Sequence, residues 1–276
     1  MRFKQAAIIG VGLIGGSLGL AIKQKRLAQK VIGIGHRRQS IEEAVKKGVV
    51  DQGYLDIRKV AGSDLVILAA PVNEIITIIP KLSKVVSPDC LVIDVGSTKS
   101  EILKAAQKVR LTFVGCHPLA GMEKKGSEYA SGSMFENALC LVVPPKKINP
   151  EIIAAVKSFW QAVGARIKVV DAASHDRILA FVSHLPHMVV FSLIDALAPE
   201  YLPYAASGLK DTTRIGLSDP AVWKDIFLTN RLPLLKAIKV FKNSLTRLES
   251  FIKTNQPKKI MAYLEKSRSK RNAITS

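Results

Sequence analysis

Residues 6–15 read Ala6-Ala7-Ile8-Ile9-Gly10-Val11-Gly12-Leu13-Ile14-Gly15, an apolar run followed by three glycines spaced as G-x-G-x-x-G. The spacing alone is a weak signal, but here it follows a predicted strand and opens a predicted helix over residues 13–25. Gly10 would form the tight turn, Gly12 would let the backbone approach a pyrophosphate, and Gly15 would let helix and strand pack closely. The free N–H groups of the helix N-terminus would face the phosphates. The stretch therefore predicts a dinucleotide-binding βαβ unit whose cofactor loop consists of Gly10, Gly12, Leu13, Ile14 and Gly15.

Strand and helix signals alternate through the first part of the chain. Ser40 is expected to cap a helix that continues to residue 47. Apolar runs predict further strands at residues 31–35, 64–70, 91–95, 112–115, 139–143 and 166–170. Near-continuous Val, Ile and Leu runs are typical of strands buried on both faces. Repeated strand–helix units predict a doubly wound, mainly parallel sheet, with antiparallel pairing an option for the later strands.

After Asp171 the strand signals stop and helical patterns take over, at residues 172–198, 220–227 and 232–254. Their apolar positions are too numerous for one exposed stripe, which suggests burial against the first domain or a second subunit. The fold class is thus α/β: a Rossmann-type dinucleotide-binding domain over residues 1–171, then an all-helical domain over residues 172–276. The charged stretch from Lys266 onward is expected to fray.

Composition narrows the class of protein. The chain has 276 residues, of which 48% are hydrophobic, and no apolar run approaches the ~18 residues of a membrane span. The chain start leads directly into a strand and leaves no room for a signal peptide, so we expect a cytoplasmic protein that binds no membrane. The three cysteines lack framework or metal-ligand spacing, so neither disulfides nor a metal site is expected.

The net charge is +19, from 41 basic and 22 acidic residues. Such a charge favours polyanionic ligands or a solvated surface. Only 6% of residues are aromatic and no recognition helix is evident, so nucleic acid is not expected as a partner. The role of the basic residues near the C-terminus stays open.

The end of the second strand indicates which cofactor is bound. An NAD-binding chain usually has Asp or Glu about 20 residues after the glycines, to bind the ribose hydroxyls. Gly35 stands there, followed by His36, Arg37 and Arg38. Arginine suits a 2′-phosphate because of its planar donor fork, so the sequence predicts NADP, with NAD as the alternative. Arg37 and Arg38 could otherwise be ordinary solvated residues.

Three loops at strand ends hold the remaining candidates of the first domain. Ala70-Pro71 would line the nicotinamide side of the cofactor. His117 lies in the turn-like segment Gly115-Cys116-His117-Pro118-Leu119-Ala120-Gly121, and Ser97 follows another strand. A hydroxyl and an imidazole beside one substrate oxygen suit removal of an alcohol proton during hydride transfer. Taken alone, His117 would more often be structural, and Ser97 could equally be a helix N-cap.

The helical part offers an arginine for a carboxylate. Arg214 ends the segment Asp211-Thr212-Thr213-Arg214, and a nearby acid could hold it ready. The plain alternative is a surface ion pair. A second segment reads Ser183-His184-Leu185-Pro186-His187, and Trp223 follows later in the chain.

The glycine loop, the His117 segment, Ser183 to His187 and Asp211 to Arg214 occur in this order and closely resemble the prephenate/arogenate dehydrogenase family of tyrosine biosynthesis. The resemblance extends to about Thr254. It implies a dinucleotide-binding domain plus a helical domain that forms a homodimer. It also implies NAD(P)-dependent oxidative decarboxylation of a small cyclohexadiene, prephenate or arogenate, to 4-hydroxyphenylpyruvate or tyrosine.

The same resemblance assigns roles to individual residues. His117 matches the catalytic base for the ring hydroxyl, and Ser97 matches a serine that helps hold this hydroxyl. Arg214 matches the arginine for the ring carboxylate. The other substrate-site matches are Glu123, Asp211, His184, His187 and Trp223. The sequence departs from the family at Met122, where relatives often have a small polar residue, and this puts the substrate preference in doubt.

Two other readings compete with this one. The β-hydroxyacid dehydrogenases and pyrroline-5-carboxylate reductases share a Rossmann start and a helical second domain, but the former usually rely on a glycine-framed lysine that is not evident here. A non-catalytic NADP-sensing protein would bind the cofactor without turning over prephenate or arogenate.

Overall fold

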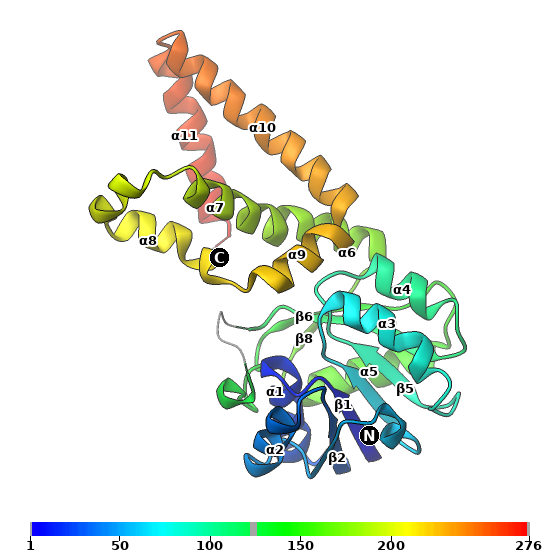
Figure 1. Cartoon of the computed structure of the whole chain (residues 1–276). Coiled ribbons are helices and arrows are strands. Elements are labelled where there is room, and N and C mark those ends of the chain that lie inside the picture. The colour runs from blue at the N-terminus through cyan, green and yellow to red at the C-terminus, as the bar shows by residue number, and fades with distance from the viewer. Residues whose placement is uncertain (1, 122–125, 275–276) are drawn as a thin grey trace. The chain divides into compact units, whose positions relative to one another are not determined.

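The structure is a computed structural model that describes residues 2–121 and 126–274. The described residues contain an eight-stranded sheet with the strand order β3-β2-β1-β4-β5-β6-β7-β8, drawn in the lower part of Figure 1. The strands are β1 (Phe3–Ile9), β2 (Ala28–Ile34), β3 (Gln52–Tyr54), β4 (Leu65–Leu68), β5 (Leu91–Asp94), β6 (Thr112–Pro118), β7 (Leu139–Val143) and β8 (Arg166–Val169). The predicted α/β class and the mainly parallel sheet are confirmed, and β3 is a short strand that the sequence reading missed.

Strand directions explain where ligands can bind. Strand β1 pairs in parallel with β2 on one side and with β4 on the other, so the chain order reverses at this point. Ligands of doubly wound sheets bind outside the carboxyl ends of the strands at such a reversal. Strand β7 pairs antiparallel with β6, with His117 opposite Leu141. This pairing extends β6 to Pro118, so His117 lies within a strand. The sequence had predicted that His117 lies in a turn after the strand, and this prediction is wrong.

Helices cover both faces of the sheet because successive strand residues point to opposite sides. Ile8 belongs to one buried cluster, which includes residues of α1 (Leu13–Gln24), α2 (Arg38–Lys46) and α5 (Pro150–Ala162). Ala7 and Ile9 belong to the other, which includes residues of α3 (Val72–Leu82) and α4 (Ser100–Ala106). Helix α2 begins at Arg38 with Arg37 as its N-cap, so the predicted Ser40 cap is wrong.

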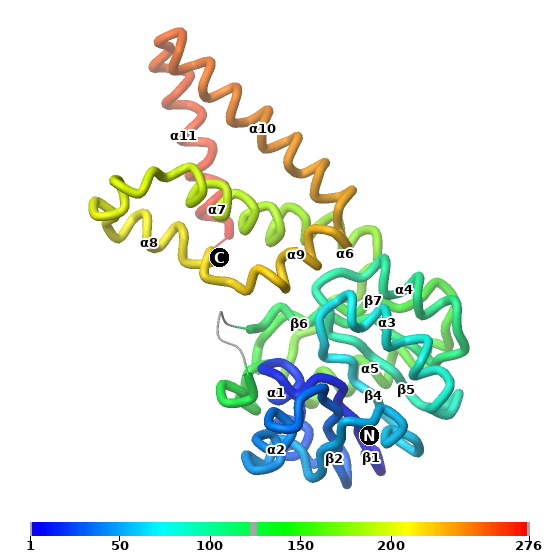
Figure 2. Tube along the Cα trace, viewed as in Figure 1, coloured from blue at the N-terminus to red at the C-terminus, as the bar shows by residue number. Residues whose placement is uncertain are grey.

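Four further helices follow the sheet: α6 (Ala172–Leu179), α7 (Leu185–Asp195), α8 (Ser207–Thr213) and α9 (Pro220–Thr229). A π-helical turn, Ala180–His184, joins α6 to α7. Short 3-10 helices lie in this part of the chain at Pro199–Tyr204 and Arg214–Leu217, and between strands of the sheet at Ile57–Val60 and Ser127–Tyr129. Figure 2 shows the trace returning through α9 to lie beside α6, where Asn230 donates a 2.8 Å hydrogen bond to the carbonyl of Asp176.

The chain divides into two compact units, Met1–Arg231 and Leu232–Ser276. The second contains most of α10 (Arg231–Lys253) and all of α11 (Pro257–Asn272). The expectation of a frayed end from Lys266 is therefore wrong as far as Asn272, since α11 continues to that residue. The predicted domain boundary between residues 171 and 172 stays a prediction.

One helical stretch, Ala172–Asp195, is long and apolar enough to cross a membrane by length and composition, with a mean hydropathy of 1.6 in its 18-residue window. The expectation that no apolar run approaches such a span is wrong on these two criteria. Mostly buried core helices of soluble proteins meet the same criteria, but only 22% of this window is buried. Here the stretch contains His175, Asp176, His184 and His187, which are polar residues of the site described below.

Candidate functional site

A cavity of about 670 Å³ lies where β1, β2, β4 and β5 end, and is lined by Gly10, Gly35, Ala69 and Val95 from the residues that follow these strands. It is the position expected for a ligand of a doubly wound sheet. The predicted cofactor and catalytic residues among its lining are Gly10, Gly12, Leu13, Ile14, His36, Arg37, Ala70, Pro71 and Ser97. Gly15 and Arg38 are not among the lining residues.

The three glycines of the loop differ in what surrounds them. Gly10 has a φ of +96°, and a Cβ there would lie 2.4 Å from the carbonyl oxygen of Ala69. A Cβ on Gly15 would lie 1.9 Å from the carbonyl oxygen of Gly10, so this glycine allows α1 to pack against the strand. A Cβ on Gly12 would meet nothing within 4 Å, and Gly12 caps α1 without a side-chain hydrogen bond. The open space and the free N–H groups at this helix N-terminus fit the pyrophosphate of a dinucleotide.

The other end of the cavity lies beside the N-terminus of α2. His36 and Arg37 are exposed residues of its lining. Arg37 caps α2 with an extended backbone and without a side-chain hydrogen bond, so the first N–H groups of α2 face the same region. Glu43 also lines the cavity and accepts a 3.2 Å hydrogen bond from Gln39. The Arg37 guanidinium and the Glu43 carboxylate thus share this end of the cavity.

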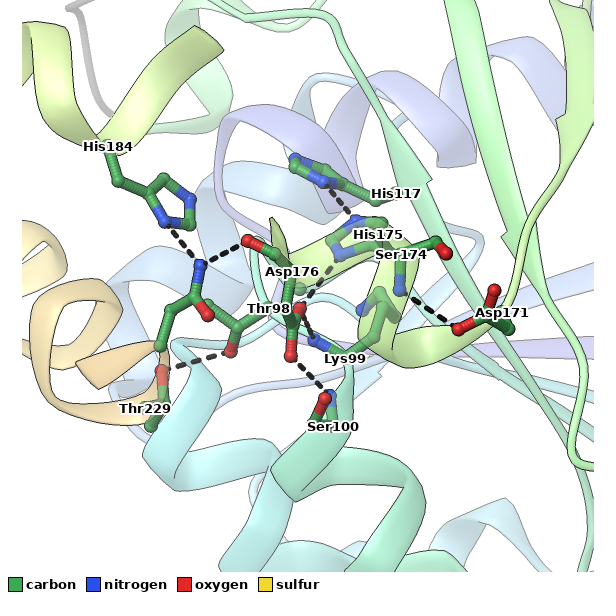
Figure 3. Close-up of polar contacts among 12 residues, drawn as sticks. Thr98, Lys99, Ser100, His117, Asp171, Ser174, His175, Asp176, His184 and Thr229 are labelled. Carbon is green, nitrogen blue, oxygen red and sulfur yellow. Dashed lines mark hydrogen bonds and ion pairs between the residues drawn. The ribbon is translucent and has the colours of Figure 1, made fainter. Parts of the chain in front are cut away.

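His117 is the first of three polar side chains in line (Figure 3). Its Nδ1 lies 2.9 Å from Nε2 of His175, and Nδ1 of His175 lies 2.9 Å from Oδ1 of Asp176. Burial lowers the pKa of His117 well below its ordinary value, and the nearby His175, Lys99 and His184 lower it further. Burial also lowers the pKa of His175, although Asp176 opposes the shift. Both imidazoles are therefore neutral near pH 7.

A fully buried ion pair supports the strand ends on which Ser97 and His117 lie. The ammonium of Lys99 contacts the Asp94 carboxylate, and both side chains are completely buried. Asp94 also accepts hydrogen bonds from the backbone N–H groups of Gly96 (2.8 Å) and Cys116 (3.3 Å). Burial raises the pKa of Asp94, and Lys99 opposes this shift. The pair joins the β5–α4 loop to β6 immediately before His117.

Two histidines of the helical segment pack around Trp223. The rings of His187 and Trp223 stack with centroids 3.6 Å apart, and the ring of His184 meets Trp223 edge-on at 6.1 Å. Asn230 donates from Nδ2 to Nδ1 of His184 at 2.8 Å. His184 therefore carries its own proton on Nε2. Burial lowers the pKa of His184 to about 4.

The remaining predicted substrate residues lie elsewhere among the described residues. Asp211 is an exposed residue of α8, and Arg214 is an exposed residue that begins the following 3-10 turn. Neither lines the cavity, and its lining does not include His117, His184, His187 or Trp223 either. Glu123 and Met122 lie outside the described residues.

Sequence reasoning gave no role to the residues that support the site: His175, Asp176, Asp94, Lys99 and Asn230. The adjacent pair His175-Asp176 at the start of an amphipathic helix was the one available signal. It could not be used without knowing that this helix packs on β6, because His117 lies 58 positions earlier in the chain.

Comparisons with known proteins show the family to which this chain belongs. A family model described as "Prephenate dehydrogenase, nucleotide-binding domain" matches residues 18–169, and one described as "Prephenate dehydrogenase, dimerization domain" matches residues 171–266. The prephenate dehydrogenase of Bacillus subtilis is 30% identical, over 97% of this chain and 75% of the relative. A crystal structure of prephenate dehydrogenase from A. aeolicus with hydroxyphenyl propionate and NAD+ is 35% identical, with a TM-score of 0.94 and 99% of each chain covered. The Synechocystis arogenate dehydrogenase structure is 29% identical, with a TM-score of 0.85 over 98% of this chain and 99% of the other. This chain therefore belongs to the prephenate dehydrogenase family of oxidoreductases.

Proposed function

We propose that this protein oxidises and decarboxylates prephenate or arogenate, with His117 as the base. The observation that carries the proposal is His117 on β6, hydrogen-bonded to His175, in the same compact unit as a glycine-loop cavity that Ser97 lines. Family membership supports the reaction type. It also argues against the two other readings of the sequence, a different two-domain oxidoreductase and a non-catalytic sensor.

The glycine loop fits a nicotinamide dinucleotide, and the residues present indicate how it would be held. The N-terminus of α1 at Gly12 would bind the pyrophosphate, and Ala70 and Pro71 would line the nicotinamide side. A nicotinamide bound there would supply the acceptor for the hydride from the carbinol carbon of the substrate. The cavity volume of about 670 Å³ is within the range of small-molecule and cofactor sites.

The chain's own residues handle the proton and the carboxylate. Neutral His117 takes the hydroxyl proton, while Ser97 holds the same oxygen. His184 is almost completely buried beside Trp223, so we expect it to orient Trp223 next to the substrate and not to touch the substrate itself. Arg214 would hold the ring carboxylate, and Asp211 and Glu123 match acidic residues that lie near this arginine in the family. The carbonyl that forms draws electrons from the ring as CO2 leaves, and aromatisation makes the step irreversible.

Replacing the base tests this function. His117→Asn should keep cofactor affinity and lose turnover by about 10²–10⁴-fold, the range of positioned proton transfer. Near-normal turnover would remove His117 from the mechanism. Arg214→Gln should mainly raise the substrate KM, and an unchanged KM would exclude it from the carboxylate site. Both effects are measured by the absorbance of the reduced nicotinamide.

We infer that the cofactor is NADP in preference to NAD, since Arg37 and His36 line the cavity and the N-terminus of α2 is free of a side-chain cap. Glu43 in the same lining favours NAD and makes the experiment necessary. Arg37→Ala should lower NADP affinity at least tenfold and leave NAD affinity nearly unchanged. Lys47→Ala, at the other end of α2, is the control with the same change of charge. Tighter NAD binding in the unmodified protein would overturn the preference.

One assay determines whether the protein prefers prephenate or arogenate. Prephenate and arogenate differ by a keto or an amino group, which a single polar contact can discriminate. Turnover of both substrates with both cofactors measures the preference directly. Met122 is the first residue to exchange, for threonine, if one substrate is strongly preferred.

We also propose a cytoplasmic homodimer. The matched dimerization domain supports pairing. So do exposed apolar side chains on the helical segments, among them Val182, Tyr201, Tyr204 and Leu217. Surfaces of this kind on a monomer are unusual and mark contact sites. Light scattering should give twice the chain mass of 30.0 kDa, and a monomer would contradict the proposal.

A further inference from the structure

The line of side chains from His117 through His175 to Asp176 does more than pack β6 against α6. His175 and Asp176 are almost completely buried, whereas His117 is partly exposed at the end of the line (Figure 3). Both links measure 2.9 Å. Two neutral histidines joined in this way can exchange donor and acceptor roles, so something must choose between the two arrangements.

Asp176 makes this choice because an ionised carboxylate can only accept hydrogen bonds. It accepts from the backbone N–H of Lys99 at 2.8 Å and from that of Ser100 at 2.9 Å. Burial opposes ionisation of Asp176, but hydrogen bonds from His175, Ser100 and Lys99 outweigh burial and lower its pKa. The carboxylate is therefore charged, and its contact with Nδ1 of His175 requires the proton to be on that nitrogen.

The remaining positions follow from this one. Neutral His175 with a proton on Nδ1 has a bare Nε2, which must accept from Nδ1–H of His117. His117 then has its lone pair on Nε2, the nitrogen that does not take part in the line. The opposite arrangement would place the lone pair of His175 against the carboxylate.

We propose that His175 and Asp176 are positioning residues that fix the tautomer of His117, so that Nε2 receives the substrate proton. The proposal rests on the proposed role of His117 as the base. In the step, the substrate O–H bond breaks and an N–H bond forms at Nε2. The O–H electron pair becomes the second bond of the new carbonyl, as hydride leaves the ring carbon that bears this oxygen. The positive charge on His117 is then two hydrogen bonds from the Asp176 carboxylate, which stabilises it.

The tautomer of His117 can be determined by NMR without measuring enzyme turnover. The chain has five histidines, so ¹⁵N labelling of histidine and long-range ¹H–¹⁵N spectra near pH 8 can be assigned by single replacements. We expect Nδ1–H on both His117 and His175 in the cofactor-free protein. A proton mainly on Nε2 of His117 would overturn the proposal whatever the activity, and would leave the role of His117 itself to the His117→Asn test.

Two replacements of His175 separate positioning from packing. Leucine keeps an apolar volume and loses both hydrogen bonds, while glutamine can donate to Asp176 and accept from His117. We expect His175→Leu to lower kcat about 10²-fold, with KM and cofactor affinity within twofold, and His175→Gln to recover at least tenfold of this loss. The control is Asp171→Asn, which changes the exposed N-cap of the same helix, 2.9 Å from the backbone N–H of Ser174. This control should turn over like the unmodified protein.

The outcomes are distinguishable. If His117→Asn is inactive and His175→Leu retains normal kcat, the positioning role is wrong and the base assignment stands. If His117→Asn itself is active, the proposed role of His117 as the base is wrong, and the positioning role that rests on it is wrong as well. Equal losses in the leucine and glutamine variants would contradict the positioning role, because only the glutamine can restore the two hydrogen bonds.

Discussion

His184 should make the protein less stable in mild acid, by an amount that can be worked out from its surroundings. Its side chain is about 1% exposed, beside Trp223, and accepts a hydrogen bond from Asn230. Burial lowers its pKa from 6.5 to about 4. The unfolded chain takes up a proton at this residue as the pH falls through 6.5, whereas the folded protein does so only near pH 4. The unfolded state binds more protons between these values, so acid favours unfolding.

The size of the effect follows from the two pKa values. Near pH 5 the unfolded histidine is almost fully charged and the folded one is mostly neutral, which costs about 2 kcal/mol of unfolding free energy relative to pH 8. His117 and His175 also have lowered pKa values, so the whole protein should lose more than this. Replacing His184 measures how much of this loss of unfolding free energy is due to His184 alone.

Urea denaturation near pH 8 and near pH 5, at one protein concentration, measures the effect. His184→Gln should lose about 2 kcal/mol less than the unmodified protein between the two pH values. His36→Gln removes an exposed histidine and should behave like the unmodified protein. If His184→Gln loses as much stability in acid as the unmodified protein, the folded state does not hold the imidazole neutral, and the reasoning is refuted.

Two further predictions concern the cofactor loop and the buried ion pair. Gly15→Ala should lower the unfolding free energy by about 1–3 kcal/mol and weaken cofactor binding, because its Cβ meets the Gly10 carbonyl, whereas Gly12→Ala should weaken binding alone. Denaturation and titration with the cofactor distinguish the two variants, and equal stability losses would contradict the assignment. Lys99→Met should cost about 3–5 kcal/mol by leaving the Asp94 charge unpaired, and adding Asp94→Asn should recover part of that loss. A double variant less stable than Lys99→Met would show that the pair itself stabilises the fold.

The local pattern of the sequence was enough for the dinucleotide-binding part of the fold. Strand β7 matches its predicted range, and β1 and α1 flank the glycine motif as expected. Buried parallel strands and close glycine packing depend on neighbours in the chain, so they leave periodic apolar runs and fixed spacings. Boundaries set by pairing were less predictable: β6 extends through His117 only because β7 lies beside it.

The sequence by itself determined the fold class, the cofactor loop, the family resemblance and the choice of His117 as the candidate base. Tertiary structure alone decided what surrounds that base. His175 and Asp176 reach it because α6 packs near β6, and the buried pair Asp94–Lys99 joins two strand ends. Such contacts join residues far apart in the chain and have no fixed spacing. The tautomer of His117, and with it the nitrogen that receives the proton, follows from these contacts and not from the motif in which the histidine lies.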